Sequence, residues 1–243
     1  MTVLTSKDNP KVRRWIRLAT DARYRRTEKR ALIEGPHLLA AALQAGLRPI
    51  TVLATEAFTD SSLLGEKPVM LGKGVFRAIV EADTPQGVAA EIAIPAGKKV
   101  DGPAVFLEGV QDPANVGAIM RSAAAFGIVR VVLDQACADP WSPRALRAGM
   151  GGQFGLSIVE TKDLGAEIDR FKGTVAVTVP RDGVAPTAAD AWVFGAEGRG
   201  LSEDTMRRAH LRVTIPMVPG TESLNVAAAA AICLYQSFSR SGG

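Results

Sequence analysis

Short apolar runs that alternate with helix-like segments constrain the fold of this chain more than any other feature of its sequence. From residue 104 onward the runs have strand length, and helix-start signals such as Ser142-Pro143 and Asp163 lie between them. Residues 129–133 are apolar without interruption, which is typical of a strand covered on both faces. The predicted strands are 104–107, 129–133, 156–160, 174–179, 191–194 and 211–215, and the predicted helices are 115–126, 144–148, 163–171 and 224–238. This alternation predicts an α/β fold with a mostly parallel sheet.

A smaller α/β pattern precedes this one. Strands are predicted at 31–33, 50–54 and 88–94, and helices at 36–45 and 75–81. Residues 95–103 then contain two prolines and two glycines without periodicity, which is typical of a linker. We therefore predict an N-terminal domain at 1–96, a linker at 97–103 and a C-terminal domain at 104–243.

The whole chain has a net charge of +4, and its basic residues are concentrated in the first thirty positions. Residues 10–22 are predicted to be helical, because Val12, Ile16 and Ala19 recur at helical spacing, with Arg13 and Arg17 one turn apart on another face. A solvated basic face and an arm that contacts phosphates both fit this pattern. The candidate phosphate contacts of this basic arm are Arg13, Arg14, Arg17, Arg23, Arg25 and Arg26.

Several other classes of protein fit the sequence poorly. Cys137 and Cys233 are far apart and lack a histidine pair at metal-ligand spacing, so we expect no bound metal and a reducing compartment. Residues 1–11 lack the apolar core of a signal peptide, and the longest apolar stretch, 226–234, is too short to cross a bilayer. We expect a cytoplasmic protein that is not associated with a membrane.

Three polar turns each follow a predicted strand in the second half of the chain. In the first, a Gly/Asp/Pro turn leads to Asn115 at the start of a helix, where free N–H groups favour anions. Gly117 leaves room for a close approach, and Arg121 projects from the same stretch of helix. Taken alone, this segment is more typical of an N-capped helix with a surface arginine than of a binding site.

The other two turns are also ordinary when each is considered alone. The second has three glycines around Glu197, but it is neither a dinucleotide fingerprint nor a P-loop. In the third, Ser223 and Asn225 begin an alanine-rich helix, where a serine is a common cap. All three turns follow strands of one predicted parallel sheet, so they can converge on a single crevice.

Together these segments resemble the three motifs of the SpoU family of RNA ribose methyltransferases, in the family's order and spacing. The resemblance covers residues 104–238, and residues 1–96 are more weakly similar to the family's substrate-binding extension, which has the fold of the ribosomal proteins L7Ae and L30e. The motifs are Asp112-Pro113-x-Asn115-x-Gly117-x-x-x-Arg121, Gly195-x-Glu197-Gly198-x-Gly200-Leu201, and Ile215-Pro216-Met217 with Ser223-Leu224-Asn225-Val226.

The resemblance implies a fold, a cofactor and an oligomeric state. The C-terminal domain would be an α/β knot, a deep trefoil that periodicity could not have suggested. S-adenosylmethionine would be the methyl donor, the chain would form a homodimer through its last helix, and RNA would be its partner. The implied donor-binding residues are Gly195, Ile215, Leu224, Thr178, Met217 and Gly198, and the implied catalytic residues are Arg121, Asn115, Glu197, Ser223 and Asn225.

Some alternatives remain open at this point. Arg121 could act as a base or stabilise the developing charge, because guanidinium holds its proton tightly. Glu197 could orient Arg121 or Asn115, while His37 and His210 are interpreted as structural. Ribosomal RNA is favoured as substrate over transfer RNA, and a non-catalytic RNA-binding protein or a knot enzyme that methylates a base nitrogen are the competing hypotheses.

Overall fold

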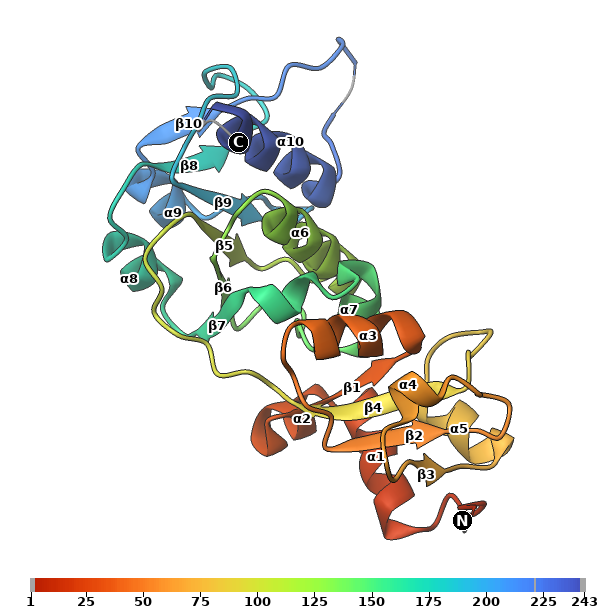
Figure 1. Cartoon of the computed structure of the whole chain (residues 1–243). Coiled ribbons are helices and arrows are strands. Elements are labelled where there is room, and N and C mark those ends of the chain that lie inside the picture. Colours follow the sequence, from red (N-terminus) through yellow and green to blue (C-terminus); the bar gives the residue numbers. More distant parts are fainter. Residues whose placement is uncertain (1–2, 221, 241–243) are drawn as a thin grey trace.

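The computed structural model describes residues 3–220 and 222–240. Residues 1–2 of the predicted N-terminal domain, and residues 221 and 241–243 of the predicted C-terminal domain, lie outside the described residues. In Figure 1 the chain forms two lobes, each built on its own sheet. The elements of the first half are α1 (Pro10–Thr20), α2 (Ala22–Glu28), β1 (Arg30–Glu34), α3 (Pro36–Gln44), β2 (Thr51–Ala54), α4 (Ser61–Leu64), β3 (Val69–Met70), α5 (Lys73–Ile79) and β4 (Val88–Ala93).

The smaller sheet has the strand order β1-β4-β2-β3, with β4 antiparallel to both of its neighbours and β3 parallel to β2. Alternate residues of β1 face opposite sides of the sheet, as the pleat requires. Ala31 and Ile33 join the cluster that includes α3, whereas Leu32 joins the cluster with α1 and α5. This half is therefore a sheet with helices on both faces.

The second half carries a six-stranded sheet. Its elements are β5 (Ala104–Glu108), α6 (Pro113–Ala125), β6 (Arg130–Asp134), α7 (Pro143–Gly149), η1 (Gly152–Gly155), β7 (Ser157–Thr161), α8 (Leu164–Asp169), β8 (Val175–Thr178), β9 (Ala191–Gly195), α9 (Glu203–Arg208), β10 (Leu211–Val213) and α10 (Val226–Arg240). The strand order is β10-β8-β9-β5-β6-β7, and every neighbouring pair is parallel. The prediction of an α/β fold with a parallel sheet is confirmed.

Helices cover both faces of this sheet, with α6, α7 and α10 on one side and α8 and α9 on the other (Figure 1). The central strands accordingly have apolar middles: Val131, Val132 and Leu133 of β6 are all fully buried. Because all six strands run in one direction, their carboxyl ends share one edge of the sheet, where α/β proteins bind ligands.

The two halves pack directly against each other. One apolar cluster contains Ile33 and Leu39 of the first half together with Leu146 of α7. The segment between the sheets follows β7 closely, since the N–H of Lys98 donates to Oγ of Ser157 at 2.8 Å and a Cβ on Gly97 would lie 2.1 Å from the carbonyl oxygen of Ile158. The domain boundary at 97–103 remains a prediction. Among the described residues, no helix is long and apolar enough to cross a bilayer.

Candidate functional site

A cavity opens at the carboxyl ends of three neighbouring strands, β8, β9 and β10. Apolar side chains and glycine backbone form most of its wall, and Glu197 is the charged residue among the described ones that line it. The lining residues are Thr178, Val179, Pro180, Gly195, Ala196, Glu197, Gly200, Leu201, Ile215, Met217, Ser223, Leu224, Val226 and Ala229.

The residues assigned to a methyl donor by resemblance lie on this wall, with one exception. The cavity is lined by Thr178, Gly195, Ile215, Met217 and Leu224, whereas Gly198 is exposed outside the lining. Sequence reasoning missed several wall residues, although their positions directly after predicted strands or within the alanine-rich helix could have indicated them. The missed residues are Val179, Pro180, Ala196, Gly200, Leu201, Val226 and Ala229.

The turn after β9 is tight because its glycines let two backbone segments touch. A Cβ on Gly195 would lie 2.6 Å from the carbonyl carbon of Gly200, so a larger residue would force the turn apart. Gly200 has a φ of 67°, which favours glycine, and its N–H donates to the carbonyl oxygen of Ala196 at 2.9 Å. This geometry brings Glu197 to the rim of the cavity.

Side chains from the three motifs form one hydrogen-bonded chain beside the cavity. Asn225 donates from Nδ2 to Oδ1 of Asn115 at 3.0 Å, and Asn115 donates from Nδ2 to Oε1 of Glu197. Asn225 also accepts at Oδ1 from the N–H groups of Ala227 and Ala228, at 2.9 and 3.3 Å, and so caps α10. Segments far apart in sequence therefore meet at one place, and Glu197 orients Asn115.

The motif residues occupy slightly different helix positions from those predicted. Asp112 caps α6 by accepting from the N–H of Ala114 at 2.9 Å, which places Asn115 in the first turn of that helix. At α10 the cap is Asn225, and Ser223 is an exposed residue of the cavity wall. The space left by Gly117 is occupied by α7, because a Cβ there would lie 2.2 Å from the carbonyl oxygen of Ala145.

Arg121 lies on α6 but not in the lining of the cavity. Its side chain is exposed, and no hydrogen bond or ion pair joins it to any residue that the structure describes. The backbone of Gly152 packs beside it, where a Cβ would lie 3.0 Å from Cα of Arg121. Within one copy of the chain, Arg121 therefore lies outside the cavity and is unpaired among the described residues.

Arg25 of the basic arm is turned inward. It is 3% exposed, pairs through Nε with Asp139 at 2.6 Å and donates from Nη1 to the carbonyl oxygens of Leu18 and Ala19, at 2.6 and 3.1 Å. The prediction that Arg25 contacts phosphate is wrong, because a buried guanidinium already bound to three acceptors cannot reach a ligand at the surface.

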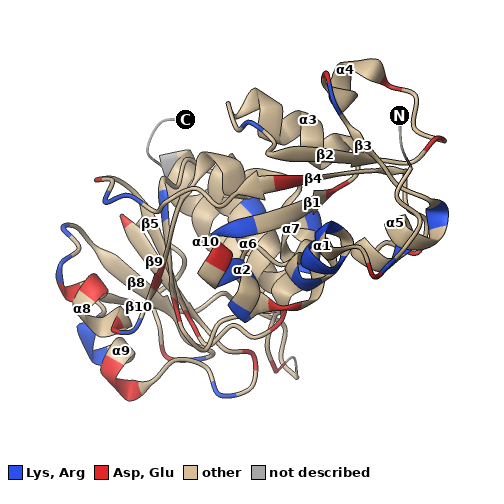
Figure 2. Ribbon diagram, turned by 90° about the horizontal axis from the view of Figure 1, so that it is seen from below, with Lys and Arg blue, Asp and Glu red and all other residues tan. Residues whose placement is uncertain are grey.

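The other arginines of the arm divide into two groups. Arg14 donates two hydrogen bonds to the buried carboxylate of Glu91, which raise the pKa of Arg14, and Arg26 is paired with Glu160. The remaining three are exposed, and Lys and Arg gather on α1 and α2 in Figure 2. These three are Arg13, which pairs with Asp8, Arg17, which stacks on Tyr24, and Arg23; Arg26 is also exposed, but it is paired with the C-terminal half.

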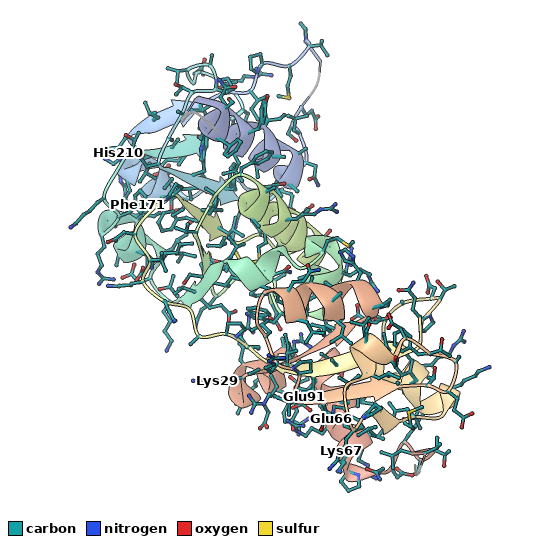
Figure 3. The ribbon with its side chains drawn as sticks, in the orientation of Figure 1. Lys29, Glu66, Lys67, Glu91, Phe171 and His210 are labelled. Carbon is teal, nitrogen blue, oxygen red and sulfur yellow. The ribbon has the colours of Figure 1, made fainter. Side chains whose placement is uncertain are left out.

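Histidine and cysteine take no part in this site. Nδ1 of His210 accepts from the N–H of Val175 at 3.0 Å, at the opposite end of β8 from the cavity (Figure 3). Burial raises the pKa of the Cys137 and Cys233 thiols to about 12, so both stay protonated near neutral pH. In the described part of the chain, no cluster of three potential ligands could hold a metal ion.

Comparison with known proteins gives matches to both halves of the chain. The model of the SpoU rRNA Methylase family matches residues 102–235, and that of the MRM3-like substrate binding domain matches residues 9–90. The 23S rRNA (guanosine(2553)-2′-O)-methyltransferase RlmP of Bacillus subtilis is 32% identical, over 97% of this chain and 98% of its own. Human mitochondrial rRNA methyltransferase 3 is 27% identical, over 88% of this chain and 68% of its own.

Solved structures of other proteins superpose on this chain over nearly its whole length. An RNA 2′-O ribose methyltransferase superposes with a TM-score of 0.81 at 26% identity, over 99% of both chains. The AdoMet-bound rRNA methyltransferase of Sinorhizobium meliloti superposes with a TM-score of 0.83 at 25% identity, over 98% of both chains. The similarity thus includes both sheets and the cavity-bearing edge.

Proposed function

The chain belongs to the SpoU rRNA methylase family, and we propose that it transfers a methyl group from S-adenosylmethionine to a ribose 2′-OH of ribosomal RNA. The observation that carries this proposal is the hydrogen-bonded chain of Asn225, Asn115 and Glu197 beside the cavity. Each amide keeps a second N–H that is free to bind a ribose or phosphate oxygen. Groups suited to RNA thus lie next to a cavity suited to an adenosyl ligand.

The wall of the cavity fits the methyl donor chemically. Ile215, Met217 and Leu224 provide apolar contacts for adenine, and the backbone around Gly195 provides polar groups. Glu197 supplies the negative charge that favours a nearby sulfonium cation. When it is bound, S-adenosylmethionine supplies an electrophilic methyl group. The AdoMet-bound Sinorhizobium relative supports this choice of donor.

The residues of the chain hold the ribose and stabilise its oxygen. A ribose hydroxyl is a poor nucleophile until its proton is removed or its developing charge is stabilised. In our proposal Arg121 binds the substrate phosphate and stabilises the developing negative charge on the ribose oxygen, while solvent water accepts the proton that leaves the 2′-OH. Asn115, Asn225 and Ser223 hold the ribose and the phosphate, while Glu197 fixes the orientation of Asn115.

A homodimer would bring Arg121 to a donor cavity. The exposed face of α10 carries Ile232, Tyr235 and Phe238, and Tyr235 is 56% exposed. Phe126, the C-cap of α6, packs on this face, with its ring centroid 5.8 Å from that of Tyr235 and 6.0 Å from that of Phe238. An apolar aromatic patch of this kind fits a second copy of the chain. Because Arg121 lies on α6 outside its own cavity, we assign it to the cavity of the partner copy.

Two features of the fold belong to the same proposal. One is the deep trefoil knot in the C-terminal half, which the match to the SpoU family supports. The other is a likeness of the N-terminal half to L7Ae and L30e, supported by its match to a substrate-binding domain. The exposed arginines of the arm, Arg13, Arg17 and Arg23, are the proposed RNA contacts of that half.

Methyl transfer to defined RNAs tests this function. Full-length protein is incubated with S-adenosylmethionine carrying a labelled methyl group and with an unmodified 23S rRNA transcript or a pool of tRNA transcripts. We expect label in the ribosomal transcript, at a linkage that resists alkaline hydrolysis. Label in tRNA alone would favour a tRNA enzyme, label on a base would favour nitrogen chemistry, and RNA binding without label would indicate a non-catalytic protein.

A further inference from the structure

Helix α2 fastens the start of the chain to the C-terminal half through two adjacent arginines. Arg25 and Asp139 form an ion pair in which the side chains are 4% and 6% exposed. Arg26 donates from Nε and Nη2 to Glu160 of β7, at 2.9 and 2.6 Å to the same oxygen. These contacts cross between the halves and add to the apolar packing there.

The attachment point of Arg25 lies next to the first motif. Asp139 belongs to the loop after β6, which pairs with the segment before α6. The N–H of Ala138 donates to the carbonyl oxygen of Val110 at 2.9 Å, and the N–H of Val110 lies 3.3 Å from Sγ of Cys137. Val110 comes two residues before the cap of α6, the helix that carries Asn115. The arm is therefore anchored close to the backbone that places Asn115.

Neighbouring arginines on the same arm behave differently. Arg23 lies on the same helix as Arg25 and Arg26 but is exposed and has no ion pair with a described residue. Arg13 is likewise exposed on α1. Arg13 and Arg23 thus make no ion pair with the C-terminal half among the described residues, whereas Arg25 and the partly exposed Arg26 do.

We propose that Arg25 and Arg26 are positioning residues, which hold the RNA-binding arm at one fixed distance from the methyl-transfer site. RNA held by the exposed arginines then presents its ribose within reach of the donor cavity. Reaction rates depend steeply on such alignment, and a misplacement of about 1 Å can lower a rate by roughly 100-fold. This inference rests on the proposed function, so its tests include a measurement that needs no activity.

The first test breaks the buried ion pair of Arg25 and Asp139 and then replaces it with a neutral pair. Arg25→Gln leaves Asp139 buried without its cation, and we expect kcat on the 23S rRNA transcript to fall at least about tenfold while KM changes less. Arg25→Gln/Asp139→Asn replaces the ion pair with two neutral amides that can bond to each other, and it should recover most of kcat. An increase in KM alone, or a double variant no better than the single one, would overturn the proposal.

The second test uses the more exposed pair, which does not endanger folding. Arg26→Glu and Glu160→Arg should each lower kcat, and the charge swap Arg26→Glu/Glu160→Arg should restore it at unchanged net charge. Arg23→Glu is the matched control on the same helix, and it should raise KM with little change in kcat. If Arg26 contacted RNA directly, the swap would stay as impaired as Arg26→Glu, which would contradict our assignment.

The distance between the halves is measured without RNA or donor. Spin labels are attached at Lys67→Cys and Lys172→Cys, two exposed positions in different halves, while the native cysteines are buried. We expect one narrow distance distribution for the native arm and a broader one for Arg25→Gln. Equal distributions would exclude a positioning role even if the protein methylates RNA, and a broadened one would support it even if no RNA is methylated.

Discussion

Asn225 donates a hydrogen bond from Nδ2 to Oδ1 of Asn115 at 3.0 Å, across 110 positions of sequence. The same side chain caps α10 through Oδ1, so one residue both starts the last helix and joins it to the first motif. Asn115 in turn holds Glu197. The three motifs are therefore one structural unit, and a substitution in one motif should disturb the side-chain geometry of the other two.

Asn225→Ala removes a helix cap and a contact within the site. We expect a loss of about 1 kcal/mol in the free energy of unfolding, from the cap, and a much larger loss of methyl transfer. Asp163→Ala is the matched control, because Asp163 caps α8 on the other face of the sheet by accepting from the N–H of Ala166 at 2.8 Å. Equal losses of activity in the two variants would mean that Asn225 acts only as a cap.

Arg121→Ala tests charge stabilisation apart from donor binding. Because Arg121 does not line the cavity, the affinity for S-adenosylmethionine measured by calorimetry should be unchanged. Methyl transfer should fall at least about 100-fold, as is typical when a stabilising donor is removed. Mixing Arg121→Ala protein with inactive Leu224→Asp protein should restore some activity if the cation serves the partner's cavity. Activity close to that of the native protein in the single variant would refute this role.

Arg13→Ala/Arg17→Ala tests the exposed part of the basic arm. Affinity for the 23S rRNA transcript should decrease, and the slope of log affinity against log salt should become less steep by about one unit for each phosphate contact that is lost. Arg170→Ala/Arg207→Ala removes two exposed arginines near α8 and α9, at the end of the C-terminal half that is far from α1, and should leave the slope unchanged (Figure 2). Identical slopes for both double variants would remove the arm from the RNA interface.

Tyr235→Asp places a charge on the exposed face of α10. Light scattering after size exclusion should show a dimer for the native protein and a monomer for this variant, because burying an unpaired carboxylate opposes association. Helix content by circular dichroism should stay the same. Lys172→Asp, at an exposed site after α8, should leave the dimer intact. A native protein that is monomeric at all concentrations would contradict the assignment of Arg121 to the partner's cavity.

The two cysteines should be inert in the folded protein. Burial raises the pKa of each thiol to about 12, so the thiolate is a minor species at pH 8, well below that value. We expect no alkylation by iodoacetamide at pH 8 under native conditions and rapid alkylation of both in denaturant, measured by mass spectrometry. Modification of Cys137 without loss of structure would show that its pocket opens.

Much of the C-terminal sheet could be predicted because its central strands contain short, uninterrupted apolar runs. Residues 129–133 needed only their own sequence to indicate a doubly covered strand, and β6 lies there. Shorter elements gave no comparable signal: β3 has two residues and owes its existence to pairing with β2. Helix α9 was not predicted either, although Ser202 caps it.

The candidate site, like the fold, could be predicted from the sequence only in part. The position of the three turns after strands of one parallel sheet indicated that their polar residues can converge, and Asn115, Glu197 and Asn225 do. Ser223 lines the cavity beside them, whereas Arg121, which was expected at the same crevice, lies outside the lining. The burial of Arg25 could not be predicted, because the sequence around an arginine in a basic run does not indicate whether it faces solvent or pairs with an aspartate 114 residues away. The role of Arg25 depends on how the N-terminal and C-terminal halves pack together, and a local sequence pattern does not indicate that packing.

The measurement that bears most directly on the account is the position of the transferred methyl group. Native protein, labelled S-adenosylmethionine and an unmodified 23S rRNA transcript are combined, and the product is digested with alkali and analysed by mass spectrometry. We expect one alkali-resistant dinucleotide that carries the label on its ribose, and none with Arg121→Ala. Label on a base, or no label in any RNA under conditions where donor and RNA both bind, would contradict it.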